Sequence, residues 1–429
     1  MPANPKPNRV FYGWWVVGAC SLIILYTSGI VHFGFTAVFE PIANEFGWSY
    51  TSISLAASMR GLETGLIAPL LGFLVDRWGP RRLVFGGAIV TGIGLVLLSR
   101  IDSLATFYGA FFVISCGLTT SGHGVMMPAV ANWFRRKVSM AMGVMASGAA
   151  VGGLLVPVVA LLVDKFQWRT AMLILGLGTL AICLPLSLLI RGKPEQYGYQ
   201  VDGEDSVAVS PGQGVALAHS PGPEFTAKEA MKRRAFWHIS LALTCHSVVL
   251  GAVLTHVMPY FSSIGVDRTT ASLAASAIPM MSIFGRLAFG WLGDRLNKIR
   301  LTAAALVVTG VGMLLFGYVS VSGMWLLLPF LIIFGTGWGA TVPLRPALLR
   351  EHFGSARFGT IHGFAVGLMQ LGTMIGAPLA GWVFDEWHSY VGIWYALAAL
   401  SVVGGVIMLT TPPAGKSRPV NSGAEADAV

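Results

Sequence analysis

The chain has 429 residues, of which 55% are hydrophobic and only 11% are charged, and its mean hydropathy is +0.70. A soluble globular domain carries about 25% charged residues, so this composition excludes a soluble protein. The net charge of +9 does not indicate nucleic-acid binding, because the basic residues cluster in short loops between apolar runs, as cytosolic loops of membrane proteins require.

Apolar runs of about 20 residues recur along the whole chain, and each is long enough to cross a bilayer as a helix. The runs do not alternate in polarity, so transmembrane strands are not indicated. We predict an all-α integral membrane protein with twelve transmembrane helices in two pseudo-symmetric six-helix bundles. The predicted spans are 12–38, 50–74, 83–99, 104–133, 139–163, 169–190, 236–264, 270–293, 301–319, 324–350, 359–384 and 389–411.

Basic residues are frequent before the first span and in the loops after every second span, and they are sparse in the loops between. Both termini are therefore predicted to be cytosolic, in a multi-pass protein of the cell (inner) membrane. Residues 201–224 are polar and rich in Gly, Pro and Ser, which is typical of a flexible linker. The predicted organisation is an N-terminal bundle over 1–192, a cytosolic linker over 193–234, and a C-terminal bundle with a short tail over 235–429.

The two halves share a repeated loop. The stretches "GFLVDRWGPRR" (72–82) and "GWLGDRLNKIR" (290–300) have the same G-x-x-x-D-R frame, and landmarks elsewhere recur at nearly the same offset. This repetition indicates a duplicated six-helix unit. The motif resembles the loop motif of the major facilitator superfamily. The resemblance implies a structural gate on the cytosolic side, made of Asp76, Arg77, Arg81, Asp294 and Arg295.

A second stretch narrows the resemblance. "NWFRRKVSMAMGVMASGAAVGG" (132–153) is similar to the loop-to-helix-five signature of monocarboxylate transporters and their oxalate/formate antiporter relatives, and "FYGWWVV" (11–17) weakly resembles the start of their first helix. The resemblance implies alternating-access transport of a small organic anion, a monocarboxylate, together with a proton. It implies no enzymatic activity, and a monomer as the functional unit.

Ionisable residues inside apolar spans are costly, so each is a candidate for function. Arg60 and Glu63 are three residues apart on one face of the second span. They are interpreted either as a buried ion pair that fixes helix packing or as the site where Glu63 carries the coupled proton.

Arg286 lies in the eighth span, about 12 Å along the helix from Asp294, which is too deep for easy snorkelling to the cytosolic face. A guanidinium grips a carboxylate with two hydrogen bonds and stays charged. In the relatives, a helix-eight Arg binds the substrate carboxylate, and Arg286 matches that position. The relatives' acidic partner one turn earlier is Ser282 here, and 359–381 holds no Lys or Arg. One cation favours a monoanion, unless Arg345 or Arg60 supplies a second charge.

His32 and His256 occupy equivalent positions in the first and seventh spans, 224 residues apart. We predict that both contribute to substrate binding, with Arg286 and Arg345, and that both are candidates for the coupled proton, with Glu63. A His titrates near pH 6.5 and attracts an anion when protonated. The alternative is an ordinary polar residue near the outer interface. His123, His246 and His362 are also predicted inside the membrane, with lower rank.

Cofactors and metals are not indicated. The four cysteines fall inside predicted helices, no zinc-type spacing is present, and the Gly-rich stretch "GGAIVTGIG" lies within a helix and lacks a P-loop Lys. Two alternative functions stay open. One is a multidrug/proton antiporter, although helix five lacks the Pro typical of that group. The other is a transporter-like membrane sensor, although the tails are short.

Overall fold

The structure is a computed structural model that describes residues 11–58, 74, 75, 77–134, 137–192, 194–197, 199, 225–293, 295–319, 323–354 and 358–413. All regular elements in these ranges are helical. They are α1 (Tyr12–Thr27), η1 (Ser28–Phe33), α2 (Phe35–Phe46), α4 (Pro80–Leu98), α5 (Leu104–Thr120), α6 (His123–Trp133), α7 (Val138–Gly152), η2 (Gly153–Leu155), α8 (Val156–Leu189), η3 (Pro194–Tyr197), α9 (Ala227–Lys232), α10 (Arg234–Ser263), α11 (Arg268–Gly293), α12 (Lys298–Tyr318), η5 (Met324–Leu326), α13 (Leu327–Phe353), α14 (Phe358–Trp387) and α15 (Val391–Leu409). Residues 50–58 are also helical.

Ten stretches of the described residues are long and apolar enough to cross a membrane. One of them, Met140–Leu189, covers two of the predicted spans. The backbone break at Gln167, where φ is 64°, separates the two. The second predicted span, 50–74, lies largely outside the described residues. With these two adjustments the helices agree with the prediction of an all-α membrane protein of twelve spans.

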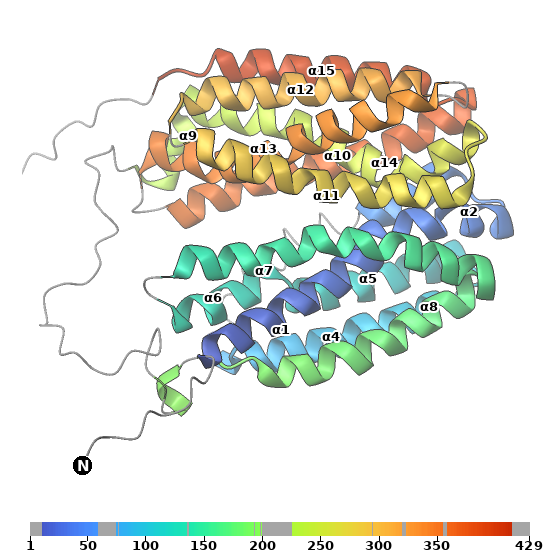
Figure 1. The fold of residues 1–429 in the computed structure, drawn as a ribbon, viewed down its shortest axis with the longest axis horizontal. Coiled ribbons are helices and arrows are strands. Elements are labelled where there is room, and N and C mark those ends of the chain that lie inside the picture. The colour runs from blue at the N-terminus through green and yellow to red at the C-terminus, as the bar shows by residue number, and fades with distance from the viewer. Residues whose placement is uncertain are drawn as a thin grey trace, which may run out of the picture.

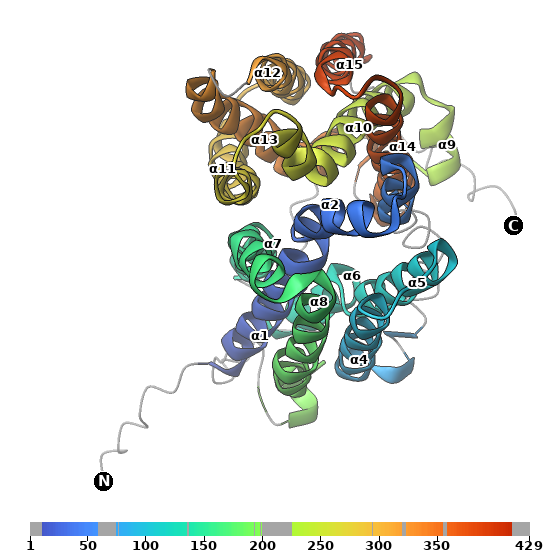
Figure 2. The same cartoon turned by 90° about the vertical axis from the view of Figure 1, so that its right-hand side faces the viewer.

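The helices form two groups that lie side by side (Figures 1 and 2). One group holds α1 and α4 to α8, and the other holds α9 to α15. Helix α2 continues α1 beyond the first group and lies between the two groups in Figure 2. The predicted domain boundaries at 192/193 and 234/235 agree with this grouping in outline and stay a prediction, because the linker residues 201–224 lie outside the described residues.

Glycines set the closest helix contacts within the C-terminal group. A Cβ atom added at Gly339 of α13 would collide with the carbonyl of Ser282 on α11, and one added at Gly376 of α14 would collide with the carbonyl of Val248 on α10. In a bilayer, helices associate through such close packing rather than through the hydrophobic effect. The pairs α11–α13 and α10–α14 are therefore tightly packed.

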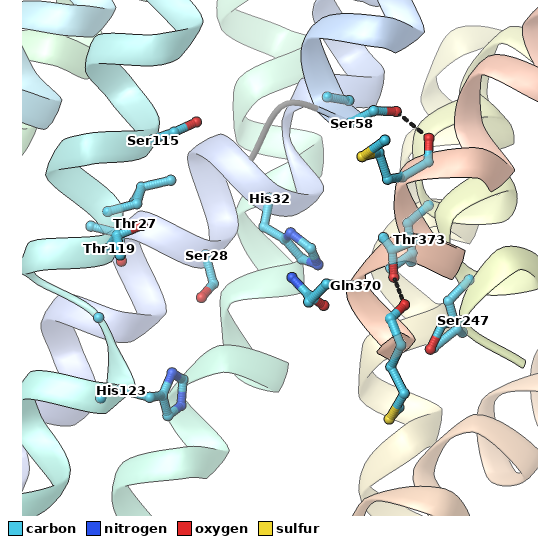
Figure 3. A pocket seen from close by; sticks show the side chains of 18 of the residues that line it. Thr27, Ser28, His32, Ser58, Ser115, Thr119, His123, Ser247, Gln370 and Thr373 are labelled. Carbon is cyan, nitrogen blue, oxygen red and sulfur yellow. Dashed lines mark hydrogen bonds between the residues drawn. The ribbon is translucent and has the colours of Figure 1, made fainter. Parts of the chain in front are cut away.

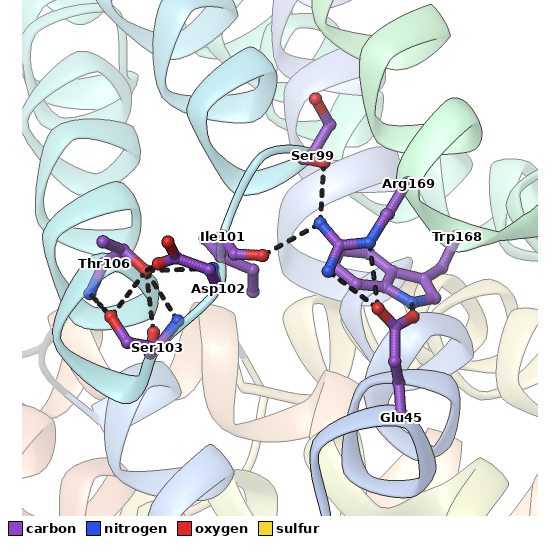
Figure 4. Close-up of polar contacts among 8 residues, drawn as sticks. All are labelled: Glu45, Ser99, Ile101, Asp102, Ser103, Thr106, Trp168 and Arg169. Atoms are coloured by element: carbon purple, nitrogen blue, oxygen red, sulfur yellow. Dashed lines mark hydrogen bonds and ion pairs between the residues drawn. The ribbon is translucent and has the colours of Figure 1, made fainter.

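Arg169 fixes one end of the N-terminal group (Figure 4). Its guanidinium donates to Glu45 Oε1 at 2.7 and 3.0 Å and to the carbonyl of Ile101 at 2.9 Å. The indole of Trp168 donates to the other oxygen of Glu45 at 2.6 Å. Trp168 and Arg169 directly follow the backbone break at Gln167. Their hydrogen bonds connect α8 to the end of α2 and to the turn between α4 and α5.

The two groups of helices contact each other at this same end. Asp385, at the end of α14, accepts hydrogen bonds from the backbone N–H groups of Tyr50 and Thr51 at 2.8 and 2.9 Å and from the Thr51 hydroxyl at 2.6 Å. Arg268, at the start of α11, forms an ion pair with Asp164 of α8. These contacts close the space between the groups at the end that carries Tyr50.

Candidate substrate cavity

A cavity of about 560 Å³ lies between the two groups of helices (Figure 3). Both groups supply its wall, and the wall combines apolar side chains with hydroxyl, amide and imidazole groups. The polar residues that line it are Thr27, Ser28, His32, Ser58, Ser115, Thr119, His123, Ser247, Arg345, Gln370 and Thr373. A small polar molecule enclosed here would contact both halves at once, which is the arrangement that alternating access requires.

His32 lies in a π-helical turn, Ser28–Phe33, inserted between α1 and α2. The turn is marked by the hydrogen bond from the Gly34 N–H to the Gly29 carbonyl at 2.8 Å. One extra residue in a turn rotates the following side chains by about 100° relative to a regular helix, and such turns are frequent at functional sites. His32 lines the cavity and points toward Gln370 of α14 (Figure 3).

Arg345 supplies the positive charge of the opposite wall. It sits in α13 between Pro343 and Pro346, two residues that interrupt the backbone hydrogen bonding of the helix. Its guanidinium donates to the sulfur of Met369 at 3.6 Å, and its Nε is buried without a hydrogen-bond partner. Among the described residues no carboxylate forms an ion pair with Arg345. The charge is therefore uncompensated within the described part of the chain.

Arg286 is half-buried in α11 and is not part of the cavity wall itself. Its Nε is buried and has no hydrogen-bond partner, and no carboxylate of the described residues pairs with it. Its charge acts on His123, which does line the cavity. Arg286 thus lies behind the wall, within electrostatic range of the space that a ligand would occupy.

His256 is placed differently from His32, although the sequence makes them equivalent. It is fully buried at the contact between the halves, with Nε2 2.9 Å from both the Ser54 hydroxyl and the Ala377 carbonyl, and Nδ1 2.9 Å from the Tyr390 hydroxyl. A carbonyl accepts only, so Nε2 carries the proton and Nδ1 accepts from Tyr390. The backbone differs as well: His256 lies within the continuous helix α10, whereas His32 lies in the π-helical turn.

Three lower-ranked histidines lie near the two arginines. His246 is fully buried, with Nε2 3.3 Å from the Thr341 hydroxyl. The charge of Arg345 acts on both His246 and His362, as that of Arg286 acts on His123. Each of the two cations is therefore accompanied by imidazole groups, and the described residues bring no carboxylate into ion-pair contact with either.

The predicted gate residues are only partly described. Asp76 and Asp294 lie outside the described residues, as do Arg60 and Glu63. Arg77 and Arg81 line a separate hollow at the end of the molecule opposite the contact between the halves. The Arg295 guanidinium lies 4.0 Å from the centre of the Trp291 ring. The gate therefore stays a prediction.

Sequence reasoning did not select Ser115, Gln370 or Asp385 as functional residues. Ser and Gln are common in apolar helices, and the sequence does not show which of them face a cavity. Asp164 and Asp385 are 221 residues apart, close to the offset of the repeated loop, and the structure shows that both carboxylates lie at contacts between the halves. This repeated spacing is the sequence signal that could have identified Asp385.

A twelve-span helical fold with a polar cavity between two halves defines a membrane transporter. The sequence profile of the Major Facilitator Superfamily matches residues 17–372 and 257–428, so the chain belongs to that superfamily. It is a multi-pass membrane protein that carries a small molecule, and it is not an enzyme.

Similarity to known transporters extends over nearly the whole chain. Monocarboxylate transporter 12-B of Danio rerio is 27% identical over 425 residues, covering 93% of this chain and 86% of the relative. Monocarboxylate transporter 11 of Homo sapiens is 27% identical over 428 residues, covering 96% and 85%. A bacterial homolog of the human lysosomal transporter Spinster, solved in an inward-facing and occupied conformation, superposes with a TM-score of 0.67 at 15% identity, covering 95% of this chain and 94% of that one. The last likeness concerns the fold.

Proposed function

We propose that the protein moves a small organic anion, a monocarboxylate, together with a proton across the cell (inner) membrane by alternating access of its two halves. The observation that carries the proposal is the guanidinium of Arg345, which lines the cavity without a carboxylate partner among the described residues. Arg286 adds a second such charge behind the wall. The names of the relatives support the choice of a carboxylate.

The electrostatic cost of these two side chains supports an anionic ligand. An Arg at the centre of a membrane helix costs at least about 2.5–3.5 kcal/mol on insertion scales. A carboxylate that forms two parallel hydrogen bonds with a guanidinium offsets part of that cost, and it does so only while it is bound. We propose Arg286 as the main carboxylate ligand, with its guanidinium turning from behind the wall into the cavity when the anion binds, and with Arg345 acting from the cavity wall.

The proton is proposed to travel with the substrate on an imidazole. His32 is the first candidate, because it lines the cavity where an arriving carboxylate would raise its proton affinity. His256 is second, since opening of the contact between the halves would expose it. Glu63 is third. Binding of anion and proton would then be cooperative.

The orientation follows from the loop charges. If both termini are cytosolic, the contacts of Asp385 and Arg268 lie at the outer face and close the space between the halves there. A monomer is proposed as the functional unit, because each chain contains both halves and the whole cavity.

Transport in vesicles tests this proposal. Purified protein in liposomes should accumulate labelled propionate when the outside is acidic, and a proton ionophore should abolish accumulation while leaving exchange of labelled for unlabelled propionate. Accumulation that survives the ionophore and depends on sodium or on a counter-substrate would contradict proton coupling. Failure to exchange any carboxylate would contradict the substrate class.

A further inference from the structure

The two walls of the cavity differ in chemistry. The wall from the C-terminal half carries the charge of Arg345 beside Ser247 and Thr373, whereas the wall from the N-terminal half carries His32, His123 and five hydroxyl groups. These come from three separate elements: Thr27 and Ser28 at the junction of α1 and η1, Ser58 at the end of helix 50–58, and Ser115 and Thr119 on α5. A ligand that spans the cavity meets these hydroxyl groups on one side (Figure 3) and the guanidinium of Arg345 on the other.

Ser115 is the unusual member of this wall. It is 2% exposed, and its hydroxyl has no hydrogen-bond partner in the described part of the protein. Other hydroxyls on the same helix bond the backbone one turn earlier: Thr120 donates to the Cys116 carbonyl at 2.8 Å, and Ser121 donates to the Gly117 carbonyl at 2.8 Å. A Ser inside a membrane helix ordinarily does the same. The hydroxyl of Ser115 instead points into the cavity (Figure 3).

Ser28 and Gln370 extend the pattern. Neither side chain has a hydrogen bond within the described residues, and both are half-buried and line the cavity, Ser28 at the start of the π-helical turn and Gln370 on the facing helix α14. The missing partner of the buried Ser115 hydroxyl is destabilising, and a bound ligand that supplies it removes that penalty. The cavity therefore offers hydrogen bonds in addition to charge, and a plain aliphatic acid would leave them unmade.

We propose that the transported carboxylate is polyhydroxylated, in the chemical class of the aldonic acids, and that Ser115 and Ser28 hydrogen-bond its hydroxyl groups. The inference rests on the proposed function, since the carboxylate end is held by the arginines. The size of the cavity agrees, because about 560 Å³ far exceeds the volume of a short unsubstituted acid and lies within the range of sites that enclose larger ligands.

Binding of matched acids to the purified full chain tests the inference. Gluconate and hexanoate have equally long carbon chains and differ in hydroxyl groups, so their dissociation constants are measured by calorimetry, with propionate as a short acid and glucose as a neutral polyol. We expect gluconate to bind at least about tenfold more tightly than hexanoate, because a site built for hydroxyls rejects the ligand that lacks them. Glucose is expected not to bind.

Two variants test whether the preference for gluconate over hexanoate depends on the serines of the cavity wall. Ser115→Ala should lower the affinity for gluconate about fivefold or more and leave hexanoate unchanged, and Ser28→Ala should act in the same direction. Ser401→Ala is the matched control, because Ser401 lies on α15 and donates to the Leu306 carbonyl, away from the cavity. Size-exclusion chromatography confirms that each variant is folded.

The outcomes separate this inference from the proposed function. If hexanoate or propionate binds as tightly as gluconate, or if Ser115→Ala lowers the affinity for both six-carbon acids equally, the hydroxyl preference is wrong and carboxylate transport stands. If no acid binds and glucose does, both the inference and the proposed function are wrong.

Discussion

At the scale of single residues, the sequence identifies charges well and hydroxyls poorly. Arg286 and Arg345 stand out because the sequence alone shows a charged residue within an apolar run. Ser115 is not, since its role depends on which face of α5 meets the cavity. His32 and His256 look equivalent in sequence, and a single π-helical turn separates their surroundings.

Arg286 is expected to require a guanidinium rather than a positive charge alone. Arg286→Lys should reduce exchange of propionate at least about tenfold, because an ammonium cannot form the two parallel hydrogen bonds of the guanidinium. Initial exchange rates in liposomes measure this effect. Arg350→Lys is the control, since Arg350 is exposed at the end of α13 and lies outside the predicted gate. Exchange at the unaltered rate in a well-folded Arg286→Gln variant would show that Arg286 does not bind substrate.

His32 is expected to couple the proton. His32→Gln keeps a polar side chain and removes the titratable group, so exchange should continue while accumulation driven by the pH gradient falls to the level of the ionophore control. The two assays are run on the same liposomes. Normal accumulation in His32→Gln, with loss in Glu63→Gln, would move the coupling site to the second span.

At the scale of helices, hydropathy predicted where the spans lie, and packing decides their shape. The break at Gln167 and the π-helical turn at Ser28–Phe33 lie inside apolar runs, so no change in composition marks them. The rigid pairs α11–α13 and α10–α14 depend on glycines that the sequence shows only as small residues.

Gly339→Ala tests the closest of these contacts. The new methyl group would collide with the Ser282 carbonyl on α11, so the helices must move apart, at an expected cost of about 1–3 kcal/mol in unfolding free energy. Thermal unfolding in detergent reports the change as a lower midpoint. Gly363→Ala is the matched control, because an added Cβ there meets open space. Equal midpoints for the two variants would show that α11 and α13 are not tightly packed.

At the scale of the whole molecule, the two halves meet at one end through side chains that bond backbone groups of the other half. Asp385 bonds two N–H groups at the start of helix 50–58, where the partial positive charge of the helix end favours a carboxylate. Asp164 contacts Arg268 at the start of α11. The alternating-access cycle must break both contacts, so their strength sets the balance between the two open states.

Asp385→Asn is expected to shift that balance toward opening at this end. The variant keeps the shape of the side chain and loses the charge, so it binds the helix end more weakly. A cysteine placed at the buried position Ala37, with the four native cysteines replaced, should react faster with a membrane-impermeant maleimide in Asp385→Asn. Glu386→Gln is the control, because Glu386 is exposed beside it. Slower labelling in Asp385→Asn than in Glu386→Gln would show that the contacts of Asp385 do not hold this end of the molecule closed.

The central claim is that an unpaired guanidinium in the cavity binds a carboxylate, and one thermal-stability titration tests it most directly. Saturating propionate should raise the unfolding midpoint of the wild-type protein by a few degrees, because a ligand at 100 times its dissociation constant stabilises by about 2.7 kcal/mol. Arg345→Gln should lose most of this rise, whereas Arg350→Gln, an exposed charge on the same helix, should keep it. An equal rise in both variants, or no rise with any carboxylate in the wild type, would contradict the account.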